Sequence, residues 1–350
     1  MRAFLLLFVL GIASCSRHVE IESHLDRLDE PVIGIVTITS PKKLREKDPS
    51  ILGMIPSSYK KWIEQTGVRP IVIPHFLSKE KIKRLISQVN GILFIGGGPS
   101  LTRENGEPTG LMRKLEFIYK EGILQNELTG GNFPIWGTCL GFQAIMFAAS
   151  DYKAKLSRVN TINEMKNLHI IPENYENSKF SEYVGPKASK FLENDVNTFF
   201  NNHFAFEVEQ FKMEPTLNNE FKIIASYIKG GKEYVAIAEH RKYPILGVQF
   251  HPEKILYEHK QMLRISLTIR SSIVSQDMSR ILFANSLKNK NHFHSQRELN
   301  HYLFHNFFSI KTAGIFETVY YFNTQYFDSD EDGQITDQTK HAGATKTLII

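Results

Sequence analysis

Cys139 is one of only two cysteines in the chain, and it stands where strand-like sequence changes to helix-like sequence. The apolar run FPIWGT (133–138) precedes it, and LGFQAIMF follows it with a helical pattern. A thiol at the start of a helix faces the positive end of the helix dipole, which favours the thiolate. Small residues around a nucleophile are typical of a nucleophile elbow, whose next backbone N–H helps to bind an oxyanion. The pattern predicts a nucleophilic Cys139, with an inert buried cysteine as the alternative.

A cysteine nucleophile needs a histidine as its base and an acid that orients this histidine. Of the 13 histidines, His251 is the best candidate because it ends the apolar run ILGVQF (245–250), where Pro252 stops the strand. Glu253 follows closely, so its carboxylate can accept the imidazole N–H that does not face the sulfur. We therefore expect Cys139, His251 and Glu253 to meet. The alternative is a surface histidine at a strand end.

A glycine-rich turn, Gly96-Gly97-Gly98, follows another apolar run at ILFI (92–95). Glycine allows backbone N–H groups to approach a substrate oxygen closely. The turn is therefore a candidate part of a substrate site, although three glycines are equally compatible with a simple turn.

The elements that must position these residues alternate between strand and helix. Strand-like runs lie at 31–39, 68–74, 92–95 and 133–138, and helical patterns lie at 57–67, 78–91 (with Ser78 as the N-cap) and 109–125. The stretch from about 151 to 250 is more β-like, with runs at 221–228, 233–241 and 243–253, and helical character returns at 254–288. This alternation predicts an α/β fold with a mostly parallel central sheet flanked by helices. Ligands of such sheets bind at the carboxyl ends of the strands, where the glycine turn and Cys139 lie.

The N-terminus has the pattern of a secretory signal peptide at residues 1–15. Arg2 precedes an apolar run that is too short to span a bilayer, and small residues follow. A lipoprotein-type site at Cys15 is the alternative. Cleavage near Cys15 would leave Cys139 as the only cysteine, so no intramolecular disulfide could form and a reactive thiol is expected.

The remaining composition excludes other classes of function. No second apolar run is long enough to span a membrane, so no stable membrane span is predicted. The formal net charge of +5 is spread along the chain. A diffuse charge of this kind argues against a nucleic-acid partner.

Four stretches together resemble the gamma-glutamyl hydrolase family, the folylpolyglutamate hydrolases: PIWGTCLGF (134–142), GILFIGGG (91–98), YPILGVQFHPEK (243–254) and NHFHSQREL (291–299). The resemblance covers residues 31–322, which would form the catalytic domain. It implies a class I glutamine amidotransferase-like fold with a flavodoxin-like arrangement in three layers. Residues 323–350 are left as a polar, acidic tail, in which the Asp328–Asp332 stretch partly matches a calcium-binding loop.

The resemblance implies a role for each reacting group. Cys139 would be the nucleophile and form a thioester with the γ-carbonyl of a glutamate. His251 would be the general base and acid, and Glu253 would orient it. The backbone N–H groups of Leu140 and Gly97 would form the oxyanion hole.

The resemblance also implies the ligands and the location. The substrate would be a pteroyl poly-γ-glutamate, contacted by His203, Gln143 and Gly96. No cofactor and no metal are expected, and a homodimer is compatible with the family. A signal peptide would send the protein outside the cell or to a lysosome or vacuole.

Gln143 departs from the family pattern, which usually has glutamate four residues after the nucleophile. Glutamine at this position is typical of the glutaminase sites of amidotransferases. A glutaminase-type amidotransferase is therefore the alternative enzyme, although no synthetase domain follows the predicted hydrolase region. A non-catalytic binding protein on the same fold is the alternative from another class.

Overall fold

The computed structural model describes residues 30–328 of the 350-residue chain. The predicted signal peptide at 1–15 lies outside the described residues, as does most of the predicted tail. Of the calcium-loop pattern, only Asp328 is described, at the end of a short helix. Among residues 30–328, no helix is long and apolar enough to cross a membrane.

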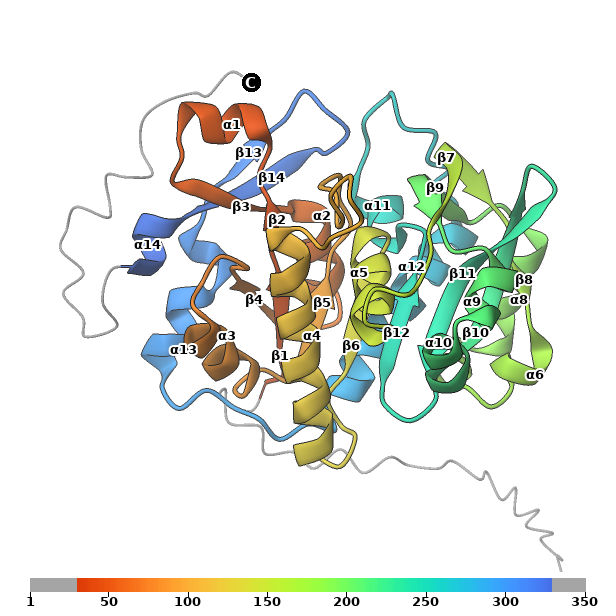
Figure 1. The fold of residues 1–350 in the computed structure, drawn as a ribbon, viewed down its shortest axis with the longest axis horizontal. Coiled ribbons are helices and arrows are strands. Elements are labelled where there is room, and N and C mark those ends of the chain that lie inside the picture. Colours follow the sequence, from red (N-terminus) through yellow and green to blue (C-terminus); the bar gives the residue numbers. More distant parts are fainter. Residues whose placement is uncertain (1–29, 329–350) are drawn as a thin grey trace, which may run out of the picture.

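An eight-stranded sheet forms the centre of the molecule, with the order β4-β1-β5-β6-β12-β11-β10-β8 (Figure 1). The first five strands are parallel: β4 (Arg69–Ile73), β1 (Val32–Val36), β5 (Gly91–Phe94), β6 (Ile135–Thr138) and β12 (Ile245–Val248). The other three extend the sheet in antiparallel fashion: β11 (Lys232–His240), β10 (Phe221–Lys229) and β8 (His169–Ile170). Strands of the parallel part are almost fully buried, as expected of a sheet covered on both faces.

Helices cover both faces of this sheet (Figure 1). One group of helices that contact each other consists of α3 (Lys79–Ile86), α4 (Gly110–Leu128) and α5 (Leu140–Ala149). The other consists of α2 (Ser57–Glu64), α11 (Pro252–Tyr257) and α12 (Ile269–Ser286). Ser78 caps α3, as predicted, by accepting a hydrogen bond from the N–H of Lys81 at 3.2 Å. The expected α/β fold with a mostly parallel sheet is confirmed.

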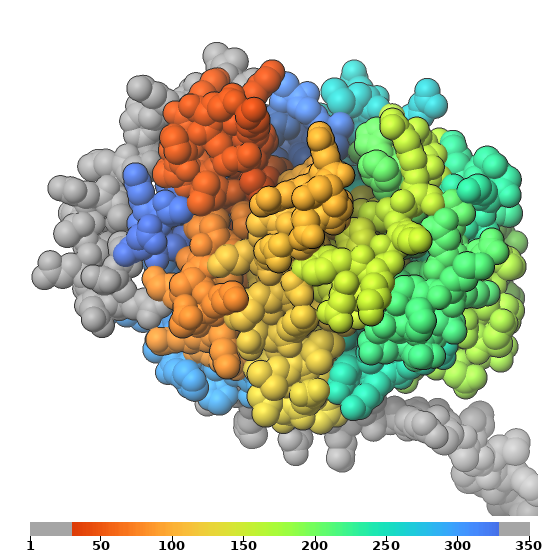
Figure 2. Space-filling model, viewed as in Figure 1, coloured from red at the N-terminus to blue at the C-terminus, as the bar shows by residue number. Residues whose placement is uncertain are grey.

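Two smaller sheets stand beside the central one. The four-stranded sheet has the order β13-β14-β3-β2 and consists of Ser309–Lys311, Thr318–Asn323, Ile51–Pro56 and Ile38–Thr39. It joins segments from both ends of the described chain, which adjoin in the space-filling view (Figure 2). The two-stranded sheet pairs β7 (Ser157–Lys166) with β9 (Thr198–Ala205).

Short helices complete the structure. They are α1 (Lys42–Lys47), α6 (Pro172–Tyr175), α7 (Lys179–Tyr183), α8 (Pro186–Asn194), α9 (Val208–Met213), α10 (Pro215–Glu220), α13 (Gln296–Tyr302), the 3₁₀ helix η1 (Phe304–Asn306) and α14 (Thr324–Asp328).

The structure differs from the sequence-based expectation in three places. The predicted strand at 31–39 is divided between two sheets, because the N–H of Thr37 bonds to Ile73 O and the chain then leaves the central sheet. The part expected to be β-like contains the five helices α6–α10, and the stretch predicted as helical from 254 is non-helical between α11 and α12. Residues 323–328, assigned to the tail, are folded onto the body, with the Phe327 side chain buried against Phe76.

Candidate active site

Three neighbouring parallel strands end together at the site. Gly96 follows β5, Cys139 follows β6 and His251 follows β12. In the pairing of β6 with β12, Thr138 lies opposite Val248, and the Cys139 N–H donates to Val248 O at 2.7 Å. The structure therefore brings these predicted residues to one edge of the sheet.

Cys139 occupies a strained turn between β6 and α5. Its φ of 50° and ψ of −104° lie outside the regions that non-glycine residues usually adopt. Such strain is typical of functional residues, and it matches the elbow expected from the sequence. Gly141 makes the turn compatible with packing, because a Cβ there would lie 2.2 Å from Phe94 O. The Cys139 side chain is free of any disulfide and buried.

His251 is fixed by Glu253, as predicted from their spacing. His251 Nδ1 lies 2.8 Å from Glu253 Oε1, and both side chains are buried. Burial by itself lowers the pKa of His251, but the negative charges of Glu253 and Cys139 outweigh it and raise that pKa to about 9. A hydrogen bond with the Cys139 side chain acts in the same direction. The arrangement thus favours an imidazolium beside the sulfur, with Nε2 left to face the thiol.

Gly96 lies against all the reacting groups. A Cβ on Gly96 would be 2.7 Å from His251 Cε1, 2.7 Å from the Tyr59 hydroxyl and 3.3 Å from Cys139 Cβ. Only glycine fits there without displacing a neighbour, and the four residues form one cluster.

Tyr59 was not found from the sequence, where its only signal is its place on the buried face of the helix predicted at 57–67. Its hydroxyl accepts the N–H of Gly96 at 2.8 Å. Burial raises the pKa of Tyr59 well above its usual range, and the negative charges of Glu253 and Cys139 raise it further. Tyr59 therefore stays neutral and holds the glycine turn in place.

The oxyanion-hole donors predicted from the resemblance are the N–H groups of Gly97 and Leu140. The Gly96 N–H is bonded to the Tyr59 hydroxyl, and the predicted donor, Gly97, is the next residue of the same turn. Leu140 is the first residue of α5, and the first amides of a helix have no acceptor within it. Both amides belong to segments that flank Cys139.

Lys254 is a second residue that sequence reasoning missed. It is buried next to Glu253, and its Nζ has no hydrogen-bond partner among residues 30–328. The Nζ lies 4.2 Å from the centre of the Phe316 ring. Burial lowers the pKa of Lys254, while the charges of Glu253 and Glu258 act in the opposite direction. A buried amine with a lowered pKa therefore stands behind the carboxylate that orients His251.

The other two predicted substrate contacts, Gln143 and His203, differ in their surroundings. Gln143 is buried, and its Nε2 donates to Phe204 O at 2.9 Å. His203 is exposed on β9, where its Nδ1 lies 3.0 Å from Asn160 Oδ1. The neighbouring Asn202 is buried. Gln143 is thus buried and His203 is exposed, and the substrate contact of His203 stays a prediction.

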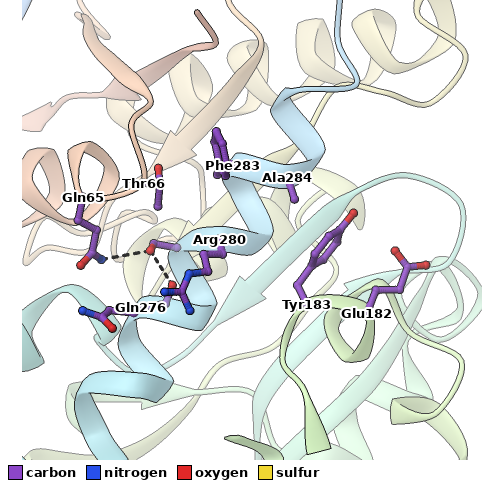
Figure 3. A pocket seen from close by; sticks show the side chains of 9 residues that line it. Gln65, Thr66, Glu182, Tyr183, Gln276, Arg280, Phe283 and Ala284 are labelled. Atoms are coloured by element: carbon purple, nitrogen blue, oxygen red, sulfur yellow. Dashed lines mark hydrogen bonds between the residues drawn. The ribbon is translucent and has the colours of Figure 1, made fainter. Parts of the chain in front are cut away.

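A groove of about 500 Å³ lies elsewhere, between α12, the end of α2 and α7 (Figure 3). Gln65 and Ser279 are joined across it by a hydrogen bond of 3.1 Å. None of the residues predicted for catalysis or substrate binding lines this groove. Within the described residues, no group of three His, Cys, Asp or Glu side chains could hold a metal ion.

Comparisons with known proteins agree with the geometry. A family model described as peptidase C26 matches residues 31–253. Gamma-glutamyl hydrolase of Homo sapiens is 28% identical over 324 residues, which cover 91% of this chain and 98% of that protein. Gamma-glutamyl hydrolase B of Dictyostelium discoideum is 28% identical over 314 residues, or 87% of this chain and 86% of that protein.

Among solved structures, the glutaminase domain of Trypanosoma brucei CTPS with bound acivicin is similar. It is 12% identical, with a TM-score of 0.45, over 76% of this chain and 98% of that chain. The TM-score is too low for this likeness to say anything about activity. The similarity to the human protein, by contrast, runs over almost the full length of both chains.

Proposed function

The chain belongs to the peptidase C26 family, and from this premise we propose that it is a γ-glutamyl hydrolase whose nucleophile is Cys139. One observation carries the proposal. Cys139 stands in a strained turn at the start of α5, beside a buried His251 that is held by Glu253 at 2.8 Å. This arrangement supports the proposal that Cys139 is the nucleophile, His251 the base and Glu253 the acid that orients it.

The reaction would begin with the Cys139 thiolate, which attacks the γ-carbonyl carbon of a glutamyl residue. The carbonyl oxygen becomes an oxyanion, and the N–H groups of Leu140 and Gly97 would stabilise it. The His251 imidazolium gives its proton to the leaving amine as the carbon–nitrogen bond breaks, which leaves a thioester on Cys139. The raised pKa of His251 supports this first role as an acid.

Hydrolysis of the thioester would then use the same residues, with His251 accepting a proton instead of donating one. Neutral His251 accepts a proton from water, whose oxygen attacks the thioester carbon. The oxyanion collapses, the carbon–sulfur bond breaks and the Cys139 thiolate is restored with His251 protonated. Glu253 stabilises each imidazolium, which is why its burial beside His251 matters for both halves of the cycle.

The substrate that we propose is a pteroyl poly-γ-glutamate. We also propose that a signal peptide directs the protein out of the cytosol. The γ-glutamyl bond is supported by the names of the relatives, which are gamma-glutamyl hydrolases, and the pteroyl group rests on the resemblance of the sequence motifs. Secretion, or delivery to a lysosome or vacuole, rests on the sequence pattern at residues 1–15. N-terminal sequencing of the mature protein would test the cleavage near Cys15.

The activity is tested with purified mature protein and pteroyl-tri-γ-glutamate, with products identified by mass spectrometry. We expect shortened pteroylglutamates with the wild type and none with Cys139→Ala. Cys139→Ala replaces the sulfur by hydrogen at a buried position, so circular dichroism should show an unchanged fold. Fast alkylation of Cys139 by iodoacetamide near neutral pH would separate an enzyme from a binding protein. Intact substrate with the wild type would contradict the proposal.

A glutaminase-type amidotransferase is the second candidate, favoured by Gln143. The same assay decides between them when free glutamine is offered in a parallel reaction. Release of glutamate from glutamine alone would favour this candidate, whereas cleavage of the pteroyl substrate alone would favour the hydrolase.

A further inference from the structure

The connection between β13 and β14, residues 312–317, packs against the short helix that carries Glu253. We call this connection the hairpin turn. The family model that matches this chain ends at residue 253, so the hairpin turn lies outside the matched part. Glu258 and Glu317, which are hydrogen-bonded across this contact, are 59 positions apart in the sequence. The fold thus joins a late segment of the chain to the segment of the predicted base.

The helix α11 depends on other elements for its position. It has only six residues, Pro252–Tyr257, and begins directly after His251. Helices this short are not stable by themselves in water. The contact between His251 Nδ1 and Glu253 Oε1 lies within the same segment, so it cannot fix either side chain relative to Cys139. Contacts with the rest of the protein must do so.

The start of α11 is held by buried neighbours. The His251 N–H donates to Phe199 O at 2.8 Å. Ser275 Oγ, in α12, donates to Pro252 O at 2.6 Å, and Trp62 Nε1 donates to Ser275 O at 3.0 Å. These contacts fix where the helix begins, and its direction depends on how its other end is held.

The end of α11 is held by the hairpin turn. Glu258, the C-cap residue, accepts the Glu317 N–H on its Oε2 at 2.6 Å. In return, Glu317 Oε1 accepts the His259 N–H at 3.2 Å. Lys260 Nζ donates to Thr312 O at 2.6 Å. Three consecutive residues after the helix are therefore bonded to the two ends of the hairpin turn.

Phe316 adds a contact within the helix itself. The centre of its ring lies 4.2 Å from Lys254 Nζ. Lys254 follows Glu253 directly, and both are buried. The ring therefore packs on the neighbour of the orienting carboxylate, while Glu317 acts at the end of the helix.

The hairpin turn has a firm base from which to hold α11. Within it, the Thr312 N–H donates to Glu317 O at 3.2 Å, and Thr312 Oγ1 donates to Phe316 O at 2.6 Å. The next residues form β14, which pairs with β3. β3 leads directly into α2, the helix of Tyr59. Reacting groups are held precisely when their supports are locked by packing and hydrogen bonds of this kind.

On this basis, and resting on the proposed function, we propose that Phe316 and Glu317 are positioning residues for the hydrolysis. Through α11, they would hold His251 and Glu253 at the place that the reaction at Cys139 requires. A displacement of a reacting group by about 1 Å can lower a rate about 100-fold. Small movements of α11 should therefore reduce kcat, whereas KM should change little because neither residue would touch the substrate.

The test uses the mature protein with Phe316→Ala and Glu317→Ala, singly and combined, and pteroyl-tri-γ-glutamate as substrate. We expect kcat to fall about tenfold in each single variant and about 100-fold in the double variant, with KM within about twofold of the wild type. Glu317→Gln keeps an oxygen that can accept the His259 N–H and should retain kcat. The matched control Phe308→Ala removes a 76% exposed ring just before β13 and should leave kcat unchanged.

Alkylation of Cys139 by iodoacetamide gives a second readout that needs no substrate. An imidazolium beside the sulfur favours the thiolate, so the alkylation rate at about pH 6.5 should fall about tenfold in the double variant. At about pH 9.5 the thiolate forms without this help, and the rates should be equal. Circular dichroism and urea unfolding establish that each variant is folded. If the double variant does not fold, the comparison of Glu317→Ala with Glu317→Gln carries the test.

The outcomes separate the two proposals. Wild-type kcat and wild-type alkylation at about pH 6.5 in a folded double variant would overturn the positioning role and leave the hydrolase standing. A rise in KM with kcat unchanged would overturn it as well. An intact pteroyl substrate with the wild type would overturn the proposed function, and the alkylation rates would still show whether the hairpin turn positions His251 beside Cys139.

Discussion

Replacing Glu253 by glutamine tests the electrostatic core of the proposed mechanism. The side chain keeps its shape, and its amide oxygen can still accept the Nδ1 proton of His251 across the present 2.8 Å contact. What is lost is the negative charge next to a fully buried imidazole. Because burial alone lowers the pKa of His251 and the charges of Glu253 and Cys139 raise it, Glu253→Gln should lower that pKa.

The size of the effect follows from the rise of the His251 pKa to about 9 from the ordinary value of 6.5. At about 1.4 kcal/mol per pH unit, this rise amounts to ~3 kcal/mol in favour of the imidazolium. Glu253 is the larger of the two charges that cause it, so we assign ~2 kcal/mol to Glu253. Losing ~2 kcal/mol of this stabilisation should lower kcat/KM roughly 30-fold for a step that needs protonated His251.

The loss should depend on pH in a defined direction. In the wild type, the imidazolium persists up to about pH 9, so the alkaline limb of kcat/KM should lie there. In Glu253→Gln the alkaline limb of kcat/KM should move to lower pH by roughly one to two pH units. The loss of kcat/KM in Glu253→Gln relative to the wild type should therefore be roughly tenfold or more larger at pH 8.5 than at pH 6.

The assay is steady-state hydrolysis of pteroyl-tri-γ-glutamate between about pH 5 and pH 10, at constant ionic strength. Glu258→Gln is the matched control, because Glu258 is also a buried carboxylate but its Oε2 accepts the N–H of Glu317 and it does not contribute to the pKa of His251. Its alkaline limb should stay in place. An unchanged alkaline limb in Glu253→Gln would refute the reasoning, whatever the loss in rate.

Three further predictions use other parts of the site. Gly96→Ala would place a Cβ 2.7 Å from His251 Cε1, so kcat/KM should fall at least about tenfold; Gly98→Ala, whose Cβ meets nothing within 4 Å, should leave it unchanged in the same assay. The folded protein holds the His251 proton more tightly than the unfolded chain, so the free energy of unfolding, measured in urea, should be highest below about pH 6.5 and fall by up to ~3 kcal/mol as the pH rises through 9. Lys254→Met removes a buried amine whose Nζ has no hydrogen-bond partner among residues 30–328, so the free energy of unfolding should stay unchanged or rise by about 1 kcal/mol, and the exposed Lys155→Met should not change it.

The central sheet could be predicted because its strands are short apolar runs separated by helices with clear ends. β5, β6 and β12 all lie within predicted runs, and their parallel pairing brings Gly96, Cys139 and His251 to one edge. The sheet of β3 and β14 could not be predicted, since it pairs residues about 260 positions apart and nothing local specifies such a partner. The helices between β8 and β9 are short and contain few apolar residues, so their period is hard to recognise.

The same difference explains which site residues could be predicted. Cys139, His251 and Glu253 are rare or reactive residue types at strand ends, so each can be found from its own neighbourhood. Tyr59 and Lys254 act through burial and charge, which depend on the folded surroundings. His203 was chosen from the family resemblance; it is exposed on β9 next to the buried Asn202, and its contact with the substrate stays a prediction.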